Sequence, residues 1–156
     1  MGINQFSIYA SFKDKRSLFI KSIRKYREFV KQHVFSDLLQ ENSGLAELES
    51  FLFKITALNK ISKKEKGCLI VNTAAKIGNK DDYIAREVNL YYDFIRDMLR
   101  KVLLNAITKN EIPANTNVEQ QANFFLGIMQ GISVASKTMD KNKLSDFISV
   151  ALAQIK

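Results

Sequence analysis

The sequence has little of what disulfide-bonded, many-turned or membrane-spanning proteins need. Its 156 residues include one proline and six glycines, and this shortage of turn formers favours long helices. The single cysteine, Cys68, cannot form an internal disulfide, and its apolar neighbours predict a buried, unreactive thiol. No apolar stretch approaches the roughly 20 residues that span a bilayer, and no signal peptide is present. We therefore expect a cytoplasmic protein without membrane contact.

Residues that carry catalysis or bind metals are equally sparse. His33 is the only histidine, and it lies in a basic helical segment without a set of metal ligands around it. We expect the imidazole of His33 to be partly packed or to face solvent. No glycine-rich phosphate loop and no nucleophile motif occurs in the sequence. We expect no enzyme, no cofactor and no metal site.

Positive charge is concentrated near the beginning of the sequence. The net charge is +8. Residues 1–31 hold eight basic and two acidic residues, a balance of +6 that leaves +2 for the remainder. The basic residues are Lys13, Lys15, Arg16, Lys21, Arg24, Lys25, Arg27 and Lys31. Such an excess predicts a surface that faces nucleic acid phosphates, the alternative being a solvated helix face.

Apolar residues recur every three or four positions through most of the chain, which predicts helices. The expected helices cover 15–41, 45–60, 68–77, 81–109, 118–138 and 142–155. Asp14, Asn117 and Asp140 each precede a helix and have the side chain of an N-cap. Gly44 suits a left-handed cap at the end of the first long helix. No linker or repeat interrupts the chain, so we expect one all-α domain preceded by a short helix over 3–10.

The first nineteen residues, MGINQFSIYASFKDKRSLF, carry the most specific motif. This run resembles the recognition helix and the following helix of the TetR family of bacterial transcriptional regulators. The family motif there is Gly-Val-Ser-x-x-(Ser/Thr)-(Leu/Ile)-Tyr-x-x-Phe-x-(Ser/Asp)-Lys-x-x-Leu. The matching positions are Gly2, Ile3, Asn4, Ser7, Ile8, Tyr9, Phe12, Asp14, Lys15 and Leu18. Segments 67–74, 110–119 and 124–132 are similar to the regulatory domain of the same family.

The resemblance implies an organisation and a set of DNA contacts. Residues 15–156 would form a TetR-like ligand-binding and dimerisation domain of about six helices. Residues 1–14 would be the remnant of a helix-turn-helix domain. By matching positions, base edges would be read by Asn4, Gln5, Phe6 and Ser7, and phosphates contacted by Tyr9, Lys13 and Lys15. Phe6 replaces a small residue that is frequent in the family.

Small residues form a ridge on the penultimate expected helix. Gly127, Gly131 and Ala135 recur every four positions, which lets another helix approach closely. The partner is either another helix of the same chain or a second copy. Family members dimerise through their last two helices, so the resemblance implies a homodimer. The expected interface residues are Phe124, Gly127, Ile128, Gly131, Ala135, Phe147 and Ala151.

Aromatic and flexible side chains gather in the two helices that are expected to meet in the middle of the domain. Family regulatory domains bind an effector between such helices. The implied pocket residues are Asn72, Tyr91, Tyr92, Phe94, Phe125 and Met129, and plain core packing is the alternative for each of them. Asn72 either orients a ligand or satisfies a buried backbone group. The implied effector is a small hydrophobic or aromatic molecule.

The resemblance implies a ligand-responsive transcriptional regulator, acting as a repressor on operator DNA. Effector binding would move the long helix that begins near Asp14 and change the spacing of two DNA-reading heads. A second hypothesis is a dimerisation and ligand-sensing module. It rests on the missing first two helices of the helix-turn-helix, without which the chain would bind DNA weakly and without sequence preference. A lipid or acyl-chain carrier is a third.

Overall fold

The computed structural model describes residues 14–61, 67–78 and 80–155. This part of the chain is all-α, as predicted, with six helices and no strand. The helices are α2 (Lys15–His33), α3 (Leu45–Ile61), α4 (Leu69–Ile77), α5 (Asp82–Thr108), α6 (Val118–Ala135) and α7 (Lys141–Ala153). None of these helices combines the length and the apolar character that crossing a membrane requires.

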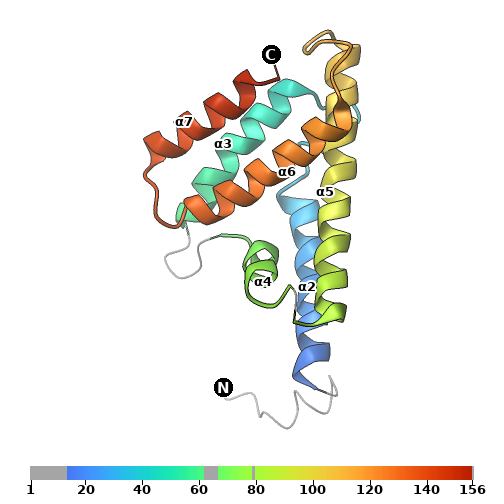
Figure 1. Ribbon diagram of the computed structural model, residues 1–156, viewed down its shortest axis with the longest axis vertical. Helices are drawn as coiled ribbons and strands as arrows, with labels where there is room; N and C mark the ends of the chain where they lie inside the picture. The colour runs from blue at the N-terminus through green and yellow to red at the C-terminus, as the bar shows by residue number, and fades with distance from the viewer. Residues whose placement is uncertain (1–13, 62–66, 79, 156) are drawn as a thin grey trace.

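The helices form two groups around a shared core (Figure 1). α2 and α5 lie side by side along the long axis of the molecule, and α3, α6 and α7 form a layer against one end of α5. α4, the shortest helix, lies below this layer and beside α2. The contact between α5 and α6 is the most extensive, and buried side chains of α5 such as Leu99 and Leu103 supply much of the core.

The predicted N-caps are confirmed. The Asp14 carboxylate accepts a hydrogen bond from the backbone amide of Ser17 at 2.7 Å. Asn117 and Asp140 cap α6 and α7 in the same way. Each side chain satisfies a backbone amide that has no partner inside its helix, and this is why the three helices begin where they do.

The first long helix is shorter than its apolar spacing predicts. α2 ends at His33 rather than near 41. The backbone amides of Val34 and Phe35 both donate to the carbonyl of Val30, which closes the helix, and turns follow. Phe35 and Leu38 are almost fully buried in these turns. The apolar spacing therefore predicted correctly that Phe35 and Leu38 are buried. It did not predict that the chain turns after His33, because tertiary packing bends the chain where a straight helix would leave the core.

Gly44 has a different role from the predicted left-handed cap. It is not among the described residues with positive φ, and it lies at the beginning of α3. The backbone amide of Leu45 donates to Glu111 Oε2 at 2.7 Å. A β-carbon on Gly44 would lie 2.5 Å from that same oxygen. Glycine leaves room here for the carboxylate of a distant loop to cap the helix at close range.

Candidate functional site

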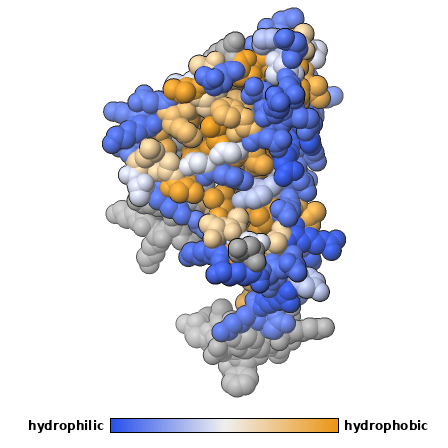
Figure 2. All heavy atoms as spheres, viewed as in Figure 1, coloured by the Kyte–Doolittle hydropathy of each residue, from blue (hydrophilic) through white to orange (hydrophobic). Residues whose placement is uncertain are grey.

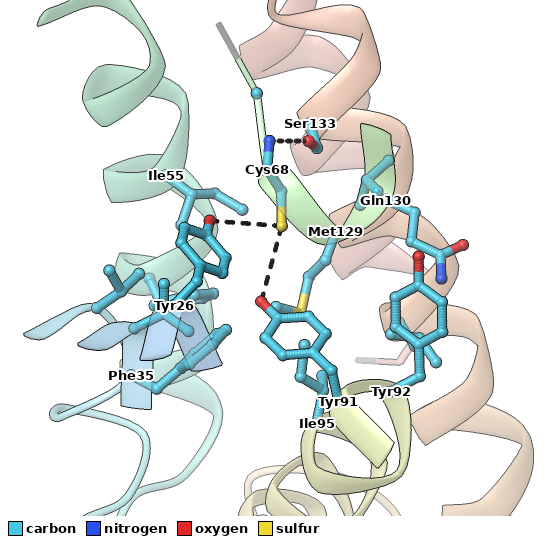
Figure 3. Close-up of a pocket in the computed structure, with 16 residues that line it drawn as sticks. Tyr26, Phe35, Ile55, Cys68, Tyr91, Tyr92, Ile95, Met129, Gln130 and Ser133 are labelled. Atoms are coloured by element: carbon cyan, nitrogen blue, oxygen red, sulfur yellow. Dashed lines mark hydrogen bonds between the residues drawn. The ribbon is translucent and has the colours of Figure 1, made fainter. Parts of the chain in front are cut away.

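A cavity of about 160 Å³ lies in the centre of the domain. Residues from α2, α3, α4, α5 and α6, together with the turn after α2, form its walls (Figure 3). Its lining consists of Tyr26, Val30, Val34, Phe35, Phe51, Ile55, Gly67, Cys68, Val71, Tyr91, Tyr92, Ile95, Leu126, Met129, Gln130 and Ser133. None of these is charged. A cavity of this kind is suited to an apolar small molecule.

Three polar side chains of the cavity lining, those of Tyr26, Tyr91 and Ser133, contact Cys68. The hydroxyl of Tyr26 donates to the Cys68 sulfur at 3.5 Å, and the Tyr91 hydroxyl lies 3.8 Å from the same sulfur. Figure 3 shows the two phenols approaching the thiol from different helices. The backbone amide of Cys68 donates to Ser133 Oγ at 2.7 Å, which ties the beginning of α4 to α6.

Gly67 permits this arrangement. Its φ of +101° is a conformation that side-chain-bearing residues rarely adopt. A β-carbon there would also lie 2.8 Å from the carbonyl oxygen of Ser133. A glycine before Cys68 therefore lets the chain turn into α4 while its backbone touches α6.

Both phenols that contact the thiol stay protonated. Burial raises the pKa of Tyr26 and of Tyr91 well above that of a free tyrosine, and the nearby Cys68 raises both further. Burial also raises the pKa of Tyr92, which is only half-buried. An environment that opposes phenolate formation keeps the hydroxyl groups as hydrogen-bond donors.

Tyr91, Tyr92 and Met129, which were predicted as pocket residues, line the cavity. Asn72, Phe94 and Phe125 do not line this cavity. Asn72 instead accepts a hydrogen bond from Lys137. Phe94 packs edge-on against Phe35, and Phe125 is fully buried beside Phe124. Helical spacing indicates which side chains turn inward but does not separate those that meet a cavity from those that fill the core.

Sequence reasoning missed Tyr26 and Cys68 as cavity residues. Tyr26 was visible only as part of the apolar stripe of α2, and Cys68 was expected to be buried and unreactive. The structure shows a partly exposed thiol at the N-cap of α4, on the cavity wall. For Tyr26, the available signal in the sequence was an aromatic side chain with a hydroxyl group within the apolar stripe of a long helix. In the described part of the chain, no three His, Cys, Asp or Glu side chains lie together as a metal ion would require.

Ion pairs join α2 to α5. Arg24 donates to Glu87 Oε1 through Nε at 2.8 Å and Nη2 at 2.5 Å, and Arg27 lies 3.6 Å from Oε2. Nearer the beginning of α2, Arg16 pairs with Asp81 at 2.8 Å and lowers the pKa of that carboxyl group. The Glu87 side chain is only 5% exposed. In the sequence, Glu87 lies on the apolar stripe of α5, and this position indicates that its carboxylate is buried when the chain folds.

We expect the two ends of the Arg24–Glu87 pair to respond differently to substitution. Arg24→Ala removes the closest cation from a buried carboxylate, which should lower stability more than Arg16→Ala, because Asp81 is more exposed. Glu87→Met leaves Arg24, which is 59% exposed, and Arg27, which is 24% exposed but keeps Glu28 at 3.6 Å, and it should stay within about 1 kcal/mol of the original chain. Urea unfolding measures all three.

The double variant Arg24→Ala/Glu87→Met is the decisive comparison. It should recover most of the stability lost in Arg24→Ala, because no buried charge remains without a partner. Additive losses from the two substitutions would show that the arginine does not compensate the charge of Glu87.

The residues predicted to contact DNA lie almost entirely outside the described part of the chain. This applies to Asn4, Gln5, Phe6, Ser7, Tyr9 and Lys13. Lys15 is exposed at the first position of α2. Three of the eight basic residues counted near the beginning of the sequence (Arg16, Arg24 and Arg27) face carboxylates of α5 or the residue before it. Part of the basic excess therefore holds α2 in place.

An apolar face covers α6 and α7. Figure 2 shows hydrophobic side chains gathered over these helices. Phe124 and Val134 of α6 are 39% and 53% exposed, and Phe147 and Val150 of α7 are 37% and 63% exposed. We call these four residues the α6–α7 face. Apolar side chains grouped in this way mark an interaction surface more often than isolated ones do.

The small residues of α6 lie along this face. A β-carbon on Gly127 would meet nothing within 4 Å, and one on Gly131 would lie 3.4 Å from the Phe147 ring. Ala135 is partly exposed. Of the other predicted interface residues, Ile128 and Ala151 are buried within the chain itself. They belong to the hydrophobic core and not to the exposed α6–α7 face.

Known proteins are similar to this chain in sequence and in structure. A model of the tetracyclin repressor-like C-terminal domain family matches residues 44–152. The HTH-type transcriptional repressor ComR of Escherichia coli strain K12 is 23% identical over 132 residues, which make up 84% of this chain. The chain spans 63% of the length of ComR.

Solved structures share the fold at low sequence identity. A cysteine mutant of the TetR family transcriptional regulator CifR, complexed with 26 bp double-strand operator DNA, superimposes with a TM-score of 0.85 at 19% identity. The alignment covers 99% of this chain and 81% of CifR. A TetR family transcriptional regulator from Agrobacterium tumefaciens gives a TM-score of 0.82 at 19% identity, over 99% of this chain and 82% of its own.

Proposed function

This chain belongs to the TetR family through its tetracyclin repressor-like C-terminal domain, and on that premise we propose that it is a ligand-responsive transcriptional repressor. A small molecule in the central cavity is the signal, and operator DNA is the target. ComR and CifR, whose names describe a repressor and an operator-bound regulator, support the same role.

The position of α2 carries the proposal. Tyr26, Val30 and Val34 of this helix line the cavity, so a bound molecule contacts α2 directly. The same helix follows the segment that resembles a DNA-recognition helix. Arg16 and Arg24 join α2 to the beginning of α5. A ligand that fits better when α2 shifts against α5 would change the balance of two conformations, and with it the geometry of the DNA-reading head.

A homodimer completes the proposed regulator. The α6–α7 face presents apolar side chains around the open surface of Gly127. Two copies related by a twofold axis would bury this face against itself and form a four-helix contact. Two DNA-reading heads would then lie at a separation set by the dimer, as helix-turn-helix dimers require.

DNA selection tests the regulatory role. The chain is incubated with a pool of random duplexes, and the enriched sequence is compared with a scrambled duplex by fluorescence anisotropy at fixed salt. A regulator prefers the enriched duplex by about 10³-fold or more. Asn4→Ala should then lose about 1–3 kcal/mol on the preferred duplex, because it removes a base contact.

Two lysines serve as matched controls for that experiment. Lys15→Ala should weaken binding to both duplexes equally and reduce the salt dependence, whereas Lys101→Ala, at an exposed position of α5 outside the basic N-terminal cluster, should change neither. Equal, weak binding to both duplexes would overturn the proposal in favour of a dimerisation and ligand-sensing module without DNA recognition of its own.

A further inference from the structure

The size of the central cavity limits what it can hold. Its volume of about 160 Å³ is close to that of a dry protein cavity of about 150 Å³ that binds benzene. The lining is dominated by aliphatic and aromatic side chains from five helices. A molecule with one ring and a short substituent fits within this space, whereas a long acyl chain or a fused polycyclic compound would extend beyond it.

The electrostatics of the cavity exclude charged molecules. No lysine, arginine, aspartate or glutamate lines it, so an ion that entered would lose its hydration without gaining a counter-charge. Burial raises the pKa of both Tyr26 and Tyr91, in agreement with a lining that offers no counter-charge. A site that disfavours phenolate also disfavours a carboxylate.

Two hydrogen-bond donors in the cavity have only a weak acceptor. The Tyr26 hydroxyl donates to sulfur, and the Tyr91 hydroxyl has the same sulfur at 3.8 Å. A thiol sulfur accepts hydrogen bonds poorly. A ligand oxygen that reached these hydroxyl groups from the cavity, in place of the sulfur, would accept stronger bonds, and this gain is available only to a ligand that carries such an atom.

We propose that the cavity binds an uncharged, single-ring molecule that carries one carbonyl-type oxygen, held by hydrogen bonds from Tyr26 and Tyr91. This inference rests on the proposed function, in which the cavity is the effector site. It adds the chemical class of the effector and the two residues that select it. The aliphatic walls bind the ring, and the phenols distinguish the ligand from a hydrocarbon of the same shape.

Three probes of matched shape test the proposal by calorimetry on the whole chain. Acetophenone has the neutral oxygen acceptor, ethylbenzene lacks it, and benzoate is charged. We expect acetophenone to bind at least as tightly as ethylbenzene, although its carbonyl loses hydration on entry. Benzoate should bind about 100-fold more weakly or not at all, because its charge would be buried without a partner.

Tyrosine variants identify the groups responsible. Tyr26→Phe and Tyr91→Phe should each weaken acetophenone binding by about 3- to 10-fold, the worth of one hydrogen bond. Each should leave ethylbenzene binding within about twofold, which also demonstrates that the cavity is still folded. Tyr83→Phe is the control, since Tyr83 is 63% exposed on α5 and does not line the cavity.

Hydrogen exchange distinguishes a failure of the proposed ligand class from a failure of the proposed effector site. Any probe that occupies the cavity should change amide exchange along α2 if the cavity is an effector site. If acetophenone and ethylbenzene both alter α2 but the tyrosine variants change neither affinity, the assigned ligand class is wrong and the effector site stands. If no probe binds at millimolar concentration, both proposals fail. Tighter binding of benzoate than of acetophenone would also overturn the ligand class.

Discussion

Phe147→Glu is expected to convert the proposed dimer to a monomer. The ring of Phe147 is 37% exposed and lies beside Gly131, in the middle of the α6–α7 face. In a twofold dimer the substitution occurs on both sides of the interface. Loss of about 2 kcal/mol from each side, together with the burial of two carboxylates, raises the dissociation constant by roughly 1,000-fold or more. Sedimentation equilibrium measures the change.

A carboxylate introduced on α2 is the control for Phe147→Glu. Phe29 is 54% exposed on α2, and Phe29→Glu should leave the dimer unchanged. The circular dichroism of Phe147→Glu should keep its helical signal, since the ring is not part of the buried core. If the unsubstituted protein sediments as a monomer at micromolar concentration, the α6–α7 face is not a dimer interface.

Phe51→Ala should cause the largest loss of stability among the substitutions considered for this chain. Phe51 is 1% exposed, and its ring centroid lies 5.2 Å from that of Phe35. Truncating a buried phenylalanine costs about 3–5 kcal/mol of unfolding free energy, because apolar contacts are lost and a void remains. Urea unfolding at a fixed protein concentration should show a lower midpoint with an unchanged slope.

The same substitution should enlarge the cavity, because Phe51 forms part of its wall. A molecule larger than acetophenone, such as propiophenone, should then bind more tightly to Phe51→Ala than to the original chain. Phe29→Ala removes the same side chain from an exposed site, where it stacks on His33, and should cost less than about 1 kcal/mol. Equal losses from the two variants would mean that the Phe51 ring is not packed as the structure indicates.

The prediction of the fold succeeded where the information is local. Asp14, Asn117 and Asp140 cap helices through their own side chains and the amides three residues later. A cap of this kind depends on a few neighbouring residues and can be read from them. The prediction for α2 failed at its end, because burial of Phe35 and Leu38 required the chain to turn at a point that no local residue specifies.

The candidate site was predicted only in part for a related reason. Tyr91 and Tyr92 were found because two adjacent aromatic residues on a long helix are conspicuous, yet Phe94, two positions further, packs outside the cavity. Cys68 and Tyr26 are 42 residues apart in sequence, and their contact arises where α4 and α2 approach each other. No periodicity within either helix contains that information.

Amino-acid order alone was enough for the all-α class, for most helix positions and for the resemblance to the TetR family, since helical spacing and capping act over a few residues. Tertiary structure decided which tyrosines face a cavity, that this cavity has no charged lining and that Glu87 is buried against Arg24. These features depend on how helices distant in sequence cross and pack. Crossing angles and separations emerge from the summed packing of the whole core rather than from any one segment.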